Sequence, residues 1–460
     1  MKKIAVFCIP AHGHTNPLLP VIAELVRRGD QVRFYSFDEF REKIEATGAE
    51  YIACDRFLPE LTAQEEQGLK NVSTTEMSIT DIRITIAMTD FLDSEYKSFQ
   101  PDVVYTDSAC FWGKLSAEKY GVPTVVSTST FAFNQMSAQY MKQSPQEIAG
   151  LMLGLPRISR EFKKLREYGY PAKRFLALVQ SDNATDSVVY TSRRFQPCAE
   201  SFSDHYAFVG PSLFTDKQPQ KRTERPLVYI SMGTVINDRP DFYGRCIEAL
   251  RSLSVDVLIS CGRAIDVSAL GTLPENVQVM PYVDQLSVLR EASVFITHCG
   301  MNSVSESLYM AAPMLLYPQT AEQQAVARRA QELGAGELLT DDSAAGIRKA
   351  VEQILGNPAY AEAAAECSAD FRQCSGTKGA ADFIEHAPNP SDGRDLIKQF
   401  NKAVVTEQII YNVLAVVIAL ILFRFVSVKY LWIYIVAEVL LSAPLKKAFQ
   451  QYYYSRLTGK

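Results

Sequence analysis

The sequence lacks the marks of several large classes of protein. Its nine cysteines are odd in number and scattered, so they form neither a disulfide framework nor a C-x-x-C zinc pair, and a reducing compartment is expected. The net charge of −5, without a basic stripe interleaved with aromatic residues, argues against a nucleic acid as partner. No D-x-D sequence occurs, and a metal ion held by that motif is therefore not expected.

The N-terminus also lacks a secretory signal peptide. Lys2 and Lys3 precede only a short apolar run, Ile4–Ile9, and no small-residue cleavage site follows it. This run is better explained as a buried strand. Because 47% of the 460 residues are apolar and 22% are charged, the chain has ample material for globular cores, and at this length we expect two or three domains.

The stretch from Met280 to Gln324 carries the strongest functional pattern. An apolar run, Ala292–Thr297, breaks into the polar loop His298–Ser303, and helical spacing follows. A buried strand that ends in a loop and opens a helix points free backbone N–H groups, and the positive end of the helix dipole, at whatever binds there. The pattern therefore predicts an anion site at this helix start.

The side chains of this loop suit a nucleoside diphosphate. Gly300 lets the backbone approach a ligand closely, and His298, Asn302 and Ser303 add donors for phosphate oxygens. Glu306, one turn later, can accept hydrogen bonds from the vicinal hydroxyls of a ribose. Ordinary turn and capping chemistry produces the same strand, loop and helix, and on this loop alone that alternative stays open.

A second loop with candidate chemistry follows the first predicted strand. Loop 10–15 contains two of the five histidines, Asn16 is a candidate N-cap, and Pro17 suits the first position of the next helix. Gln31–Ser36 is the next strand, so this opening predicts a right-handed parallel unit. In such a fold ligands bind at the carboxyl edge of the sheet, where His14 lies. A lone loop histidine is otherwise most often a surface donor.

Two further strands of the same predicted sheet end in residues of interest. Asp107 ends the strand at 101–107, although a carboxylate at a strand end is often only a cap or turn residue. Phe131 and Phe133 follow the strand at 121–127. They either fill a core or line a pocket for flat or greasy molecules.

The 280–324 stretch resembles the donor-binding signature of UDP-dependent glycosyltransferases. The matching positions are Tyr282, Gln285, His298, Gly300, Asn302, Ser303, Glu306, Glu322 and Gln323. In that family the first position is usually Trp, stacked on uracil, and Tyr282 stands there in this chain. The segment HGHTNPLLP, at 12–20, resembles the first loop of macrolide-type members, and the resemblance extends over roughly residues 1 to 385.

The resemblance implies a role for each part of the site. His14 is the general base that removes the proton of an acceptor hydroxyl, and Asp107 holds it. The pair Glu322 and Gln323 binds sugar hydroxyls, although an acid at a helix start also suits the dipole by itself. His298 and the helix dipole offset the charge of the leaving diphosphate. In all, we expect the donor to be bound by Ser231, Gly233, Thr234, Tyr282, Val283, Gln285, His298, Gly300, Asn302, Ser303, Glu306, Glu322 and Gln323, and the acceptor by His12, Phe131 and Phe133.

The implied fold is α/β of the GT-B type, with two Rossmann-like doubly wound domains facing a cleft. We place the acceptor domain at 1–210, a linker at 211–225, the UDP-sugar domain at 226–388 and a second linker at 389–403. The implied reaction is inverting transfer of a hexose from a UDP-sugar to a hydroxyl of a hydrophobic acceptor, which is a lipid, sterol, polyketide or polyphenol. No cofactor and no metal are expected. A nucleotide-sugar 2-epimerase and a non-catalytic nucleotide-sugar-binding partner are the alternatives.

The C-terminus departs from the resemblance. Ile409–Phe423 and Tyr430–Leu445 are apolar runs separated by the segment 424–429. As a helix each reaches only about 22–24 Å, less than the ~30 Å hydrocarbon core of a membrane. A core helix is the alternative, but two complete domains leave it nothing to pack against. We therefore expect a membrane-associated helical hairpin at 404–448, spanning or re-entrant, a polar tail at 449–460, and catalytic domains in the cytoplasm.

Overall fold

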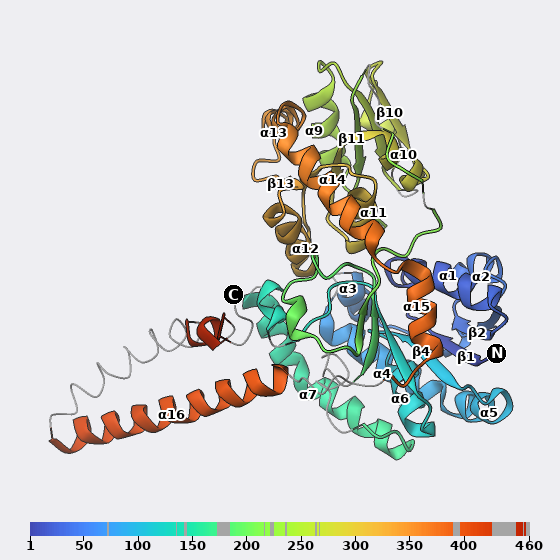
Figure 1. Ribbon diagram of the computed structural model, residues 1–460, viewed down its shortest axis with the longest axis vertical. Helices are drawn as coiled ribbons and strands as arrows, with labels where there is room; N and C mark the ends of the chain where they lie inside the picture. The colour runs from blue at the N-terminus through green and yellow to red at the C-terminus, as the bar shows by residue number, and fades with distance from the viewer. Residues whose placement is uncertain are drawn as a thin grey trace.

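The computed structural model contains two lobes, each built around a parallel β-sheet, and a long helix that extends away from them (Figure 1). It describes residues 1–460 except 71–72, 135, 142–144, 173–184, 216, 221–224, 235–236, 263–264, 266, 390–395, 426–447, 454 and 457–460. The predicted arrangement of two α/β domains is therefore present in the fold.

The first sheet has seven parallel strands in the order β3-β2-β1-β4-β5-β6-β7. Their bounds are β1 (Lys3–Phe7), β2 (Gln31–Ser36), β3 (Glu50–Ala53), β4 (Val103–Asp107), β5 (Thr124–Thr128), β6 (Asp186–Val189) and β7 (Tyr206–Phe208). Strands β1 and β4 lie at the centre and are almost completely buried, because helices cover both faces of a parallel sheet. This is why apolar residues predominate in both strands, at Ile4–Phe7 in β1 and at 103–105 in β4.

In the part of the chain that the structure describes, seven α-helices and several short 3₁₀ turns connect these strands. The described helices are α1 (His12–Arg27), α2 (Arg41–Glu45), α3 (Ala63–Lys70), α4 (Thr74–Ala87), α5 (Thr89–Phe99), α6 (Phe111–Tyr120) and α7 (Pro145–Glu167). The 3₁₀ turns are η1 (Asp38–Phe40), η2 (Asp55–Phe57), η3 (Ser137–Tyr140) and η4 (Ala199–Ser201).

The second sheet has six parallel strands in the order β10-β9-β8-β11-β12-β13. Their bounds are β8 (Leu227–Ser231), β9 (Asp256–Ser260), β10 (Val277–Met280), β11 (Ala292–Thr297), β12 (Met314–Leu316) and β13 (Gly336–Leu338). Between and after them come α9 (Pro240–Leu250), η5 (Val267–Leu270), α10 (Gln285–Glu291), α11 (Met301–Tyr309), α12 (Ala321–Glu332), α13 (Ala344–Gly356), α14 (Pro358–Gln373), α15 (Gly376–Glu385) and α16 (Leu396–Phe425).

Each sheet reverses its winding direction at one pair of neighbouring strands. In the first sheet β1 lies beside β4, and in the second β8 lies beside β11, so successive strands are added outward in opposite directions from each pair. The loops that leave the carboxyl ends of such a pair separate and open a crevice, which is where open α/β sheets bind ligands. The loops after β1 and β11 are the two that the sequence singled out.

Helix α1 begins earlier than the sequence predicted. The prediction of Asn16 as N-cap with Pro17 at the first position was wrong, because the helix starts at His12 with Ala11 as its N-cap. The carbonyl of Ala11 accepts hydrogen bonds from the backbone N–H groups of His14 (3.0 Å) and Thr15 (2.9 Å). Pro17 therefore lies inside the helix.

Helix α15 returns from the second lobe to the first. The range predicted for the second domain, 226–388, includes α15, but the apolar side of α15, with Ala380, Ala381 and Ile384, belongs to the core of the first sheet. In Figure 1 this helix lies against α1. The apolar face of α15 is therefore buried because the chain returns from the second lobe to the first.

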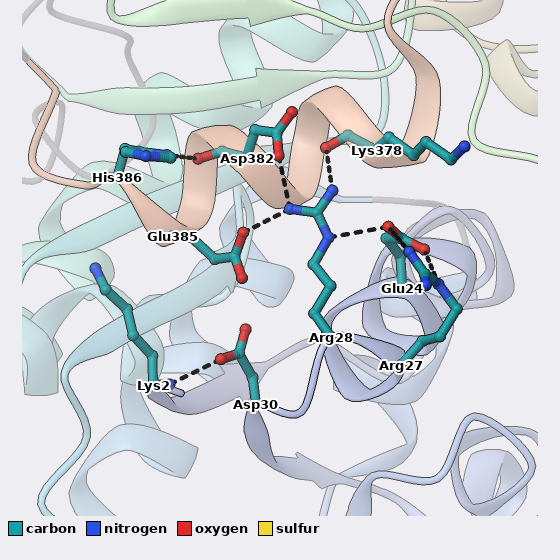
Figure 2. A network of polar contacts seen from close by, with 9 residues as sticks. All are labelled: Lys2, Glu24, Arg27, Arg28, Asp30, Lys378, Asp382, Glu385 and His386. Atoms are coloured by element: carbon teal, nitrogen blue, oxygen red, sulfur yellow. Dashed lines mark hydrogen bonds and ion pairs between the residues drawn. The ribbon is translucent and has the colours of Figure 1, made fainter.

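Arg28, which directly follows α1, joins α1 to α15 through hydrogen bonds and ion pairs (Figure 2). Nη1 of Arg28 contacts Oδ1 of Asp382 at 2.6 Å and Oε2 of Glu385 at 2.5 Å, and Nη2 donates to the carbonyl of Lys378 at 3.1 Å. Its Nε donates to Oε1 of Glu24 at 2.9 Å. Burial opposes the positive charge of Arg28, but its three carboxylate partners together raise its pKa above the ordinary value.

The C-terminal helix α16 extends away from both lobes (Figure 1). Its exposed apolar residues include Val405, Ile409, Ile410, Val413, Leu414, Val417, Ile418, Leu420 and Ile421, each more than 40% exposed. Within the described residues no helix is both long enough and apolar enough to cross a membrane. The predicted transmembrane helix therefore has no support there, and the second predicted run, Tyr430–Leu445, lies outside the described residues.

We expect Arg28→Met to lower the free energy of unfolding by about 1–3 kcal/mol, because it leaves the carboxylates of α15 facing α1 without their cation. Arg27→Met is the matched control, since Arg27 is 66% exposed and pairs only with Glu24 among the described residues. Exposed pairs contribute about 0–1 kcal/mol. Urea unfolding of both variants measures the difference, and equal losses would contradict a fastening role for Arg28.

Candidate active site

A histidine–aspartate pair lies at the crevice of the first sheet. His14 is in the first turn of α1, and Asp107 ends β4, the strand next to β1. Nδ1 of His14 lies 2.8 Å from Oδ2 of Asp107, which is fully buried, while 30% of the His14 side chain is exposed. Oδ1 of Asp107 accepts from the backbone N–H of Ala109 at 2.8 Å. A buried aspartate that accepts from Nδ1 fixes the tautomer in which Nε2 can take a proton.

The surrounding charges shift the pKa of His14 upward. Burial by itself lowers this pKa, but the charge of Asp107 and its hydrogen bond to the ring, followed by the charges of Glu322 and Asp81, outweigh it. The influence of Glu322 shows that the first turn of α12 in the second lobe lies within electrostatic reach of the His14 ring. The two halves of the predicted site therefore face each other.

Sequence reasoning missed two residues beside this pair. The hydroxyl of Ser129, just after β5, lies 3.1 Å from Nδ1 of His14. Asp81 of α4 acts on His14 through its charge. The only signal for Ser129 was a polar residue at the end of a predicted strand, and nothing in the sequence linked α4 to the site.

The predicted strand, loop and helix are present after β11, but the loop is shorter than predicted because α11 begins inside the range His298–Ser303. Ser231 pairs with Thr297 in the sheet, and this places the turn after β8 beside His298. Helix α11 begins at Met301 with Gly300 as N-cap. Cys299 has a φ of 68°, a strained value for a residue with a side chain, and such strain concentrates at functional loops.

His298, predicted as a donor to the diphosphate, lies in a partly buried position. Burial lowers its pKa to about 4, against a smaller opposing effect of the Ser231 backbone, so the ring is neutral at physiological pH. Its Nδ1 is buried and has no hydrogen-bond partner among the described residues. A neutral ring offers a hydrogen bond to a diphosphate, whereas the compensating positive potential comes from the N–H groups at the start of α11.

Two glycines give this ring its space. A Cβ atom on Gly233 would lie 2.5 Å from Cε1 and Nε2 of His298, and one on Gly300 would lie 2.6 Å from Nε2. Gly233 also has a φ of 77°, which disfavours any residue with a side chain. Ser231 is buried and its Oγ accepts from the N–H of Gly233 at 3.3 Å, while Thr234 is exposed.

The predicted ribose site is held together by one glutamine. Nε2 of Gln285 donates to Oε2 of Glu306 at 2.6 Å and to Oγ of Ser303 at 3.3 Å. Burial raises the pKa of Glu306 to about 7, and the bond from Gln285 only partly opposes this. Tyr282 is 75% exposed and so is free to stack on a base, and Val283 packs against the core of the lobe.

The predicted sugar pair has a fixed geometry. The backbone N–H of Gln319 donates to Oε1 of Gln323 at 2.7 Å. Because an N–H group only donates, this contact places the amide oxygen of Gln323 inward and leaves its NH₂ group for a ligand. Arg239 in turn donates to Oε1 of Gln319, a contact that the sequence did not suggest.

The predicted acceptor residues have mixed surroundings. His12 turns to Glu39, with Nε2 2.9 Å from Oε1, and packs edge-on against Phe40. Phe131 is only 1% exposed and packs in the core of the second lobe, where core filling explains it. Phe133 is partly buried beside it. An acceptor-binding role for these three residues stays a prediction.

One hydrogen bond joins the two loops directly. Nδ2 of Asn302, at the start of α11, donates to the backbone carbonyl of Gly13 at 3.0 Å. Gly13 stands between His12 and His14 in α1. The predicted donor loop and the predicted base are therefore brought together across the lobes.

We expect Gly233→Ala to weaken the binding of uridine diphosphate about 10-fold or more, because the new methyl group displaces the His298 ring and strains the turn. Isothermal titration calorimetry with UDP measures this. Gly244→Ala is the control, since a Cβ there meets nothing within 4 Å. Unchanged affinity in Gly233→Ala would show that the position of the ring does not matter for the diphosphate.

The chain is similar to known glycosyltransferases and to known structures over most of its length. Residues 214–372 match the family model of UDP-glucoronosyl and UDP-glucosyl transferases. The NDP-glycosyltransferase YjiC of Bacillus licheniformis is 35% identical over 404 residues, which cover 84% of this chain and 97% of that protein. The oleandomycin glycosyltransferase of Streptomyces antibioticus is 31% identical, with coverage of 83% and 90%.

Solved structures agree with this likeness. The glycotransferase of kitacinnamycin superposes with a TM-score of 0.69 at 27% identity, covering 84% of this chain and 98% of that chain. The calicheamicin glycosyltransferase CalG4 has a TM-score of 0.68 at 26% identity, with coverage of 85% and 100%. The predicted GT-B fold with two Rossmann-like domains is thereby confirmed. The chain belongs to the UDP-glycosyltransferase family and is a glycosyltransferase of the macrolide type.

Proposed function

We propose that this glycosyltransferase moves a hexose from a UDP-sugar to a hydroxyl of a hydrophobic acceptor and inverts the anomeric centre. The observation that carries the proposal is the bond between buried Asp107 and Nδ1 of His14, opposite the start of α11. Such a pair serves a base that takes a proton from an acceptor, and a free helix start serves a leaving diphosphate.

The reaction then proceeds in one displacement. Nε2 of His14 takes the proton of the acceptor hydroxyl as its oxygen attacks the anomeric carbon from the face opposite the diphosphate. The new carbon–oxygen bond forms while the bond to UDP breaks, and UDP leaves with the electron pair. An α-linked donor therefore gives a β-linked product. Asp107 stabilises the imidazolium that forms, and the α11 start stabilises the diphosphate, so no metal ion is required in this proposal.

The donor residues divide by chemistry. Tyr282 stacks on the base, Glu306 accepts from the ribose, and Glu322 with Gln323 binds the hexose. The raised pKa of Glu306 is consistent with a carboxyl group that gains hydroxyl partners only when the donor is bound. Ser231, Gly233 and Thr234 line the turn on the other side of His298.

The surroundings of α16 favour an acceptor that dissolves in a membrane. Its aliphatic face is exposed between Lys402 and Arg424, two residues that suit anionic head groups. At its base Val404 packs against the small cluster of Met136 and Cys198, and Met136 lies in the segment that follows Phe131 and Phe133. A membrane surface reached through α16 is therefore connected to the predicted acceptor side, and we propose a lipid, sterol, polyketide or polyphenol acceptor met at the cytoplasmic face of a membrane.

We expect His14→Ala to lower the rate of transfer by about 10²–10⁴-fold while UDP binding persists, because His14 serves the acceptor side. Screening UDP-sugars against lipid and polyphenol acceptors by mass spectrometry supplies the assay. His205→Ala is the matched control: its Nδ1 lies 2.5 Å from Oδ1 of Asp186, which begins β6 at the opposite edge of the sheet. Near-normal transfer by His14→Ala would remove this base from the mechanism.

The pH dependence of kcat/KM follows from the raised pKa of His14. A base acts only when unprotonated, so activity is lost as the pH falls through a pKa that lies above the ordinary 6.5. Asp107→Asn removes the largest charge that raises this pKa, and the acidic limb should then move to lower pH while the rate falls. An unmoved limb in Asp107→Asn would assign it to another group.

Membrane association has its own test. We expect the double substitution Ile410→Glu with Leu414→Glu to reduce flotation with anionic phospholipid vesicles about 10-fold or more, because both side chains are 55% exposed on α16. Leu153→Glu, at an 80% exposed position of α7, is the control. Equal flotation of all three proteins, or none for the unchanged chain, would contradict docking through α16.

A further inference from the structure

Helix α1 contains a proline at a position where an α-helix forms a backbone hydrogen bond. Pro17 has no N–H group, so the carbonyl of Gly13, four residues earlier, has no donor within the helix. The proline ring also crowds that carbonyl and tilts it outward. An interior proline is costly, and because Gly13 is exposed, its carbonyl is open to a donor from solvent or from another element.

That partner comes from the other lobe. Nδ2 of Asn302 donates to the carbonyl of Gly13 at 3.0 Å. Because a carbonyl only accepts, the contact fixes which end of the Asn302 amide faces α1. An amide NH₂ group carries two N–H bonds, so one hydrogen remains for a phosphate oxygen at the start of α11. The same amide can thus touch both halves of the reaction centre.

We propose that Pro17 and Asn302 form a positioning pair for His14. Pro17 keeps the Gly13 carbonyl free, Asn302 binds it, and the bond sets the first turn of α1 against the helix start that receives the diphosphate. His14 is the next residue after Gly13, so its ring is placed relative to the donor by this contact. The proposal rests on the proposed function, since it assigns His14 the role of base.

The neighbouring proline offers a matched comparison. Pro20 also lies inside α1, is buried like Pro17, and also removes an intrahelical bond, this time to the carbonyl of Asn16. In the described part of the chain no side chain of the second lobe binds that carbonyl. Replacing either proline by alanine restores a helical N–H, but only at position 17 does the new N–H compete with Asn302.

The test compares Pro17→Ala with Pro20→Ala in the full chain. We expect Pro17→Ala to lower kcat about 10-fold. This loss is at least that expected from one missing hydrogen bond and is smaller than the about 100-fold loss of rate that a 1 Å misplacement of a reacting group can cause. Its affinity for UDP should stay within about 2-fold and its melting temperature should hold or rise, because alanine favours a helix interior. Pro20→Ala should keep its kcat. A loss of rate without a loss of stability is not explained by a merely structural role.

A double-mutant cycle with Asn302→Ala shows whether Pro17 affects the rate through Asn302. If Pro17 acts through Asn302, adding Pro17→Ala to Asn302→Ala should cost no further rate. Full additivity, or equal rates for Pro17→Ala and Pro20→Ala, would overturn the proposal. If Pro17→Ala does not fold, the rate of Asn302→Asp, which lacks the amide donor, decides in its place, and an unchanged kcat would overturn the pair. An unchanged chain that transfers no hexose would instead overturn the proposed function.

Discussion

Helix α1 is the element on which the arrangement of the two lobes depends, because later parts of the chain hold it at both ends. At its start the carbonyl of Gly13 accepts from Asn302, and at its end Arg28 binds the carboxylates of α15. The residue that carries the proposed base, His14, lies in the first turn of this doubly held helix. The contact with Asn302 therefore links the position of the base to the second lobe.

The two sides of the cleft differ in charge. Around His14 the carboxylates of Asp107, Glu322 and Asp81 outweigh the effect of burial and raise its pKa. In the donor pocket burial dominates instead, lowering the pKa of His298 to about 4 and raising that of Glu306 to about 7. In the proposed function a diphosphate therefore binds mainly to the backbone N–H groups at the start of α11, whose position is set by the fold and is insensitive to pH.

The C-terminal helix differs from the lobes in how its apolar residues are used. In α15 they complete the core of the first sheet, whereas in α16 many stay exposed. At the base of α16, Val404 packs against a small cluster that contains Met136 and Cys198. The apolar residues of α15 are therefore used in packing against the first lobe. Helix α16 instead extends outward from the segment around Met136, which follows the predicted acceptor residues in the chain.

The sequence by itself determined the local units. Apolar runs predicted the buried strands, the polar loops after β1 and β11 marked both candidate sites, and Asp107 stood out as the end of a strand, because these features depend on residues close together in the chain. Only the tertiary structure decided which distant residues meet. Ser129 and Asp81 approach His14 from separate elements, α15 packs on the opposite lobe, and Pro17 lies inside a helix that local rules start at this residue. The carbonyl of Gly13, which Pro17 cannot bind, accepts instead from Asn302, far away in the sequence.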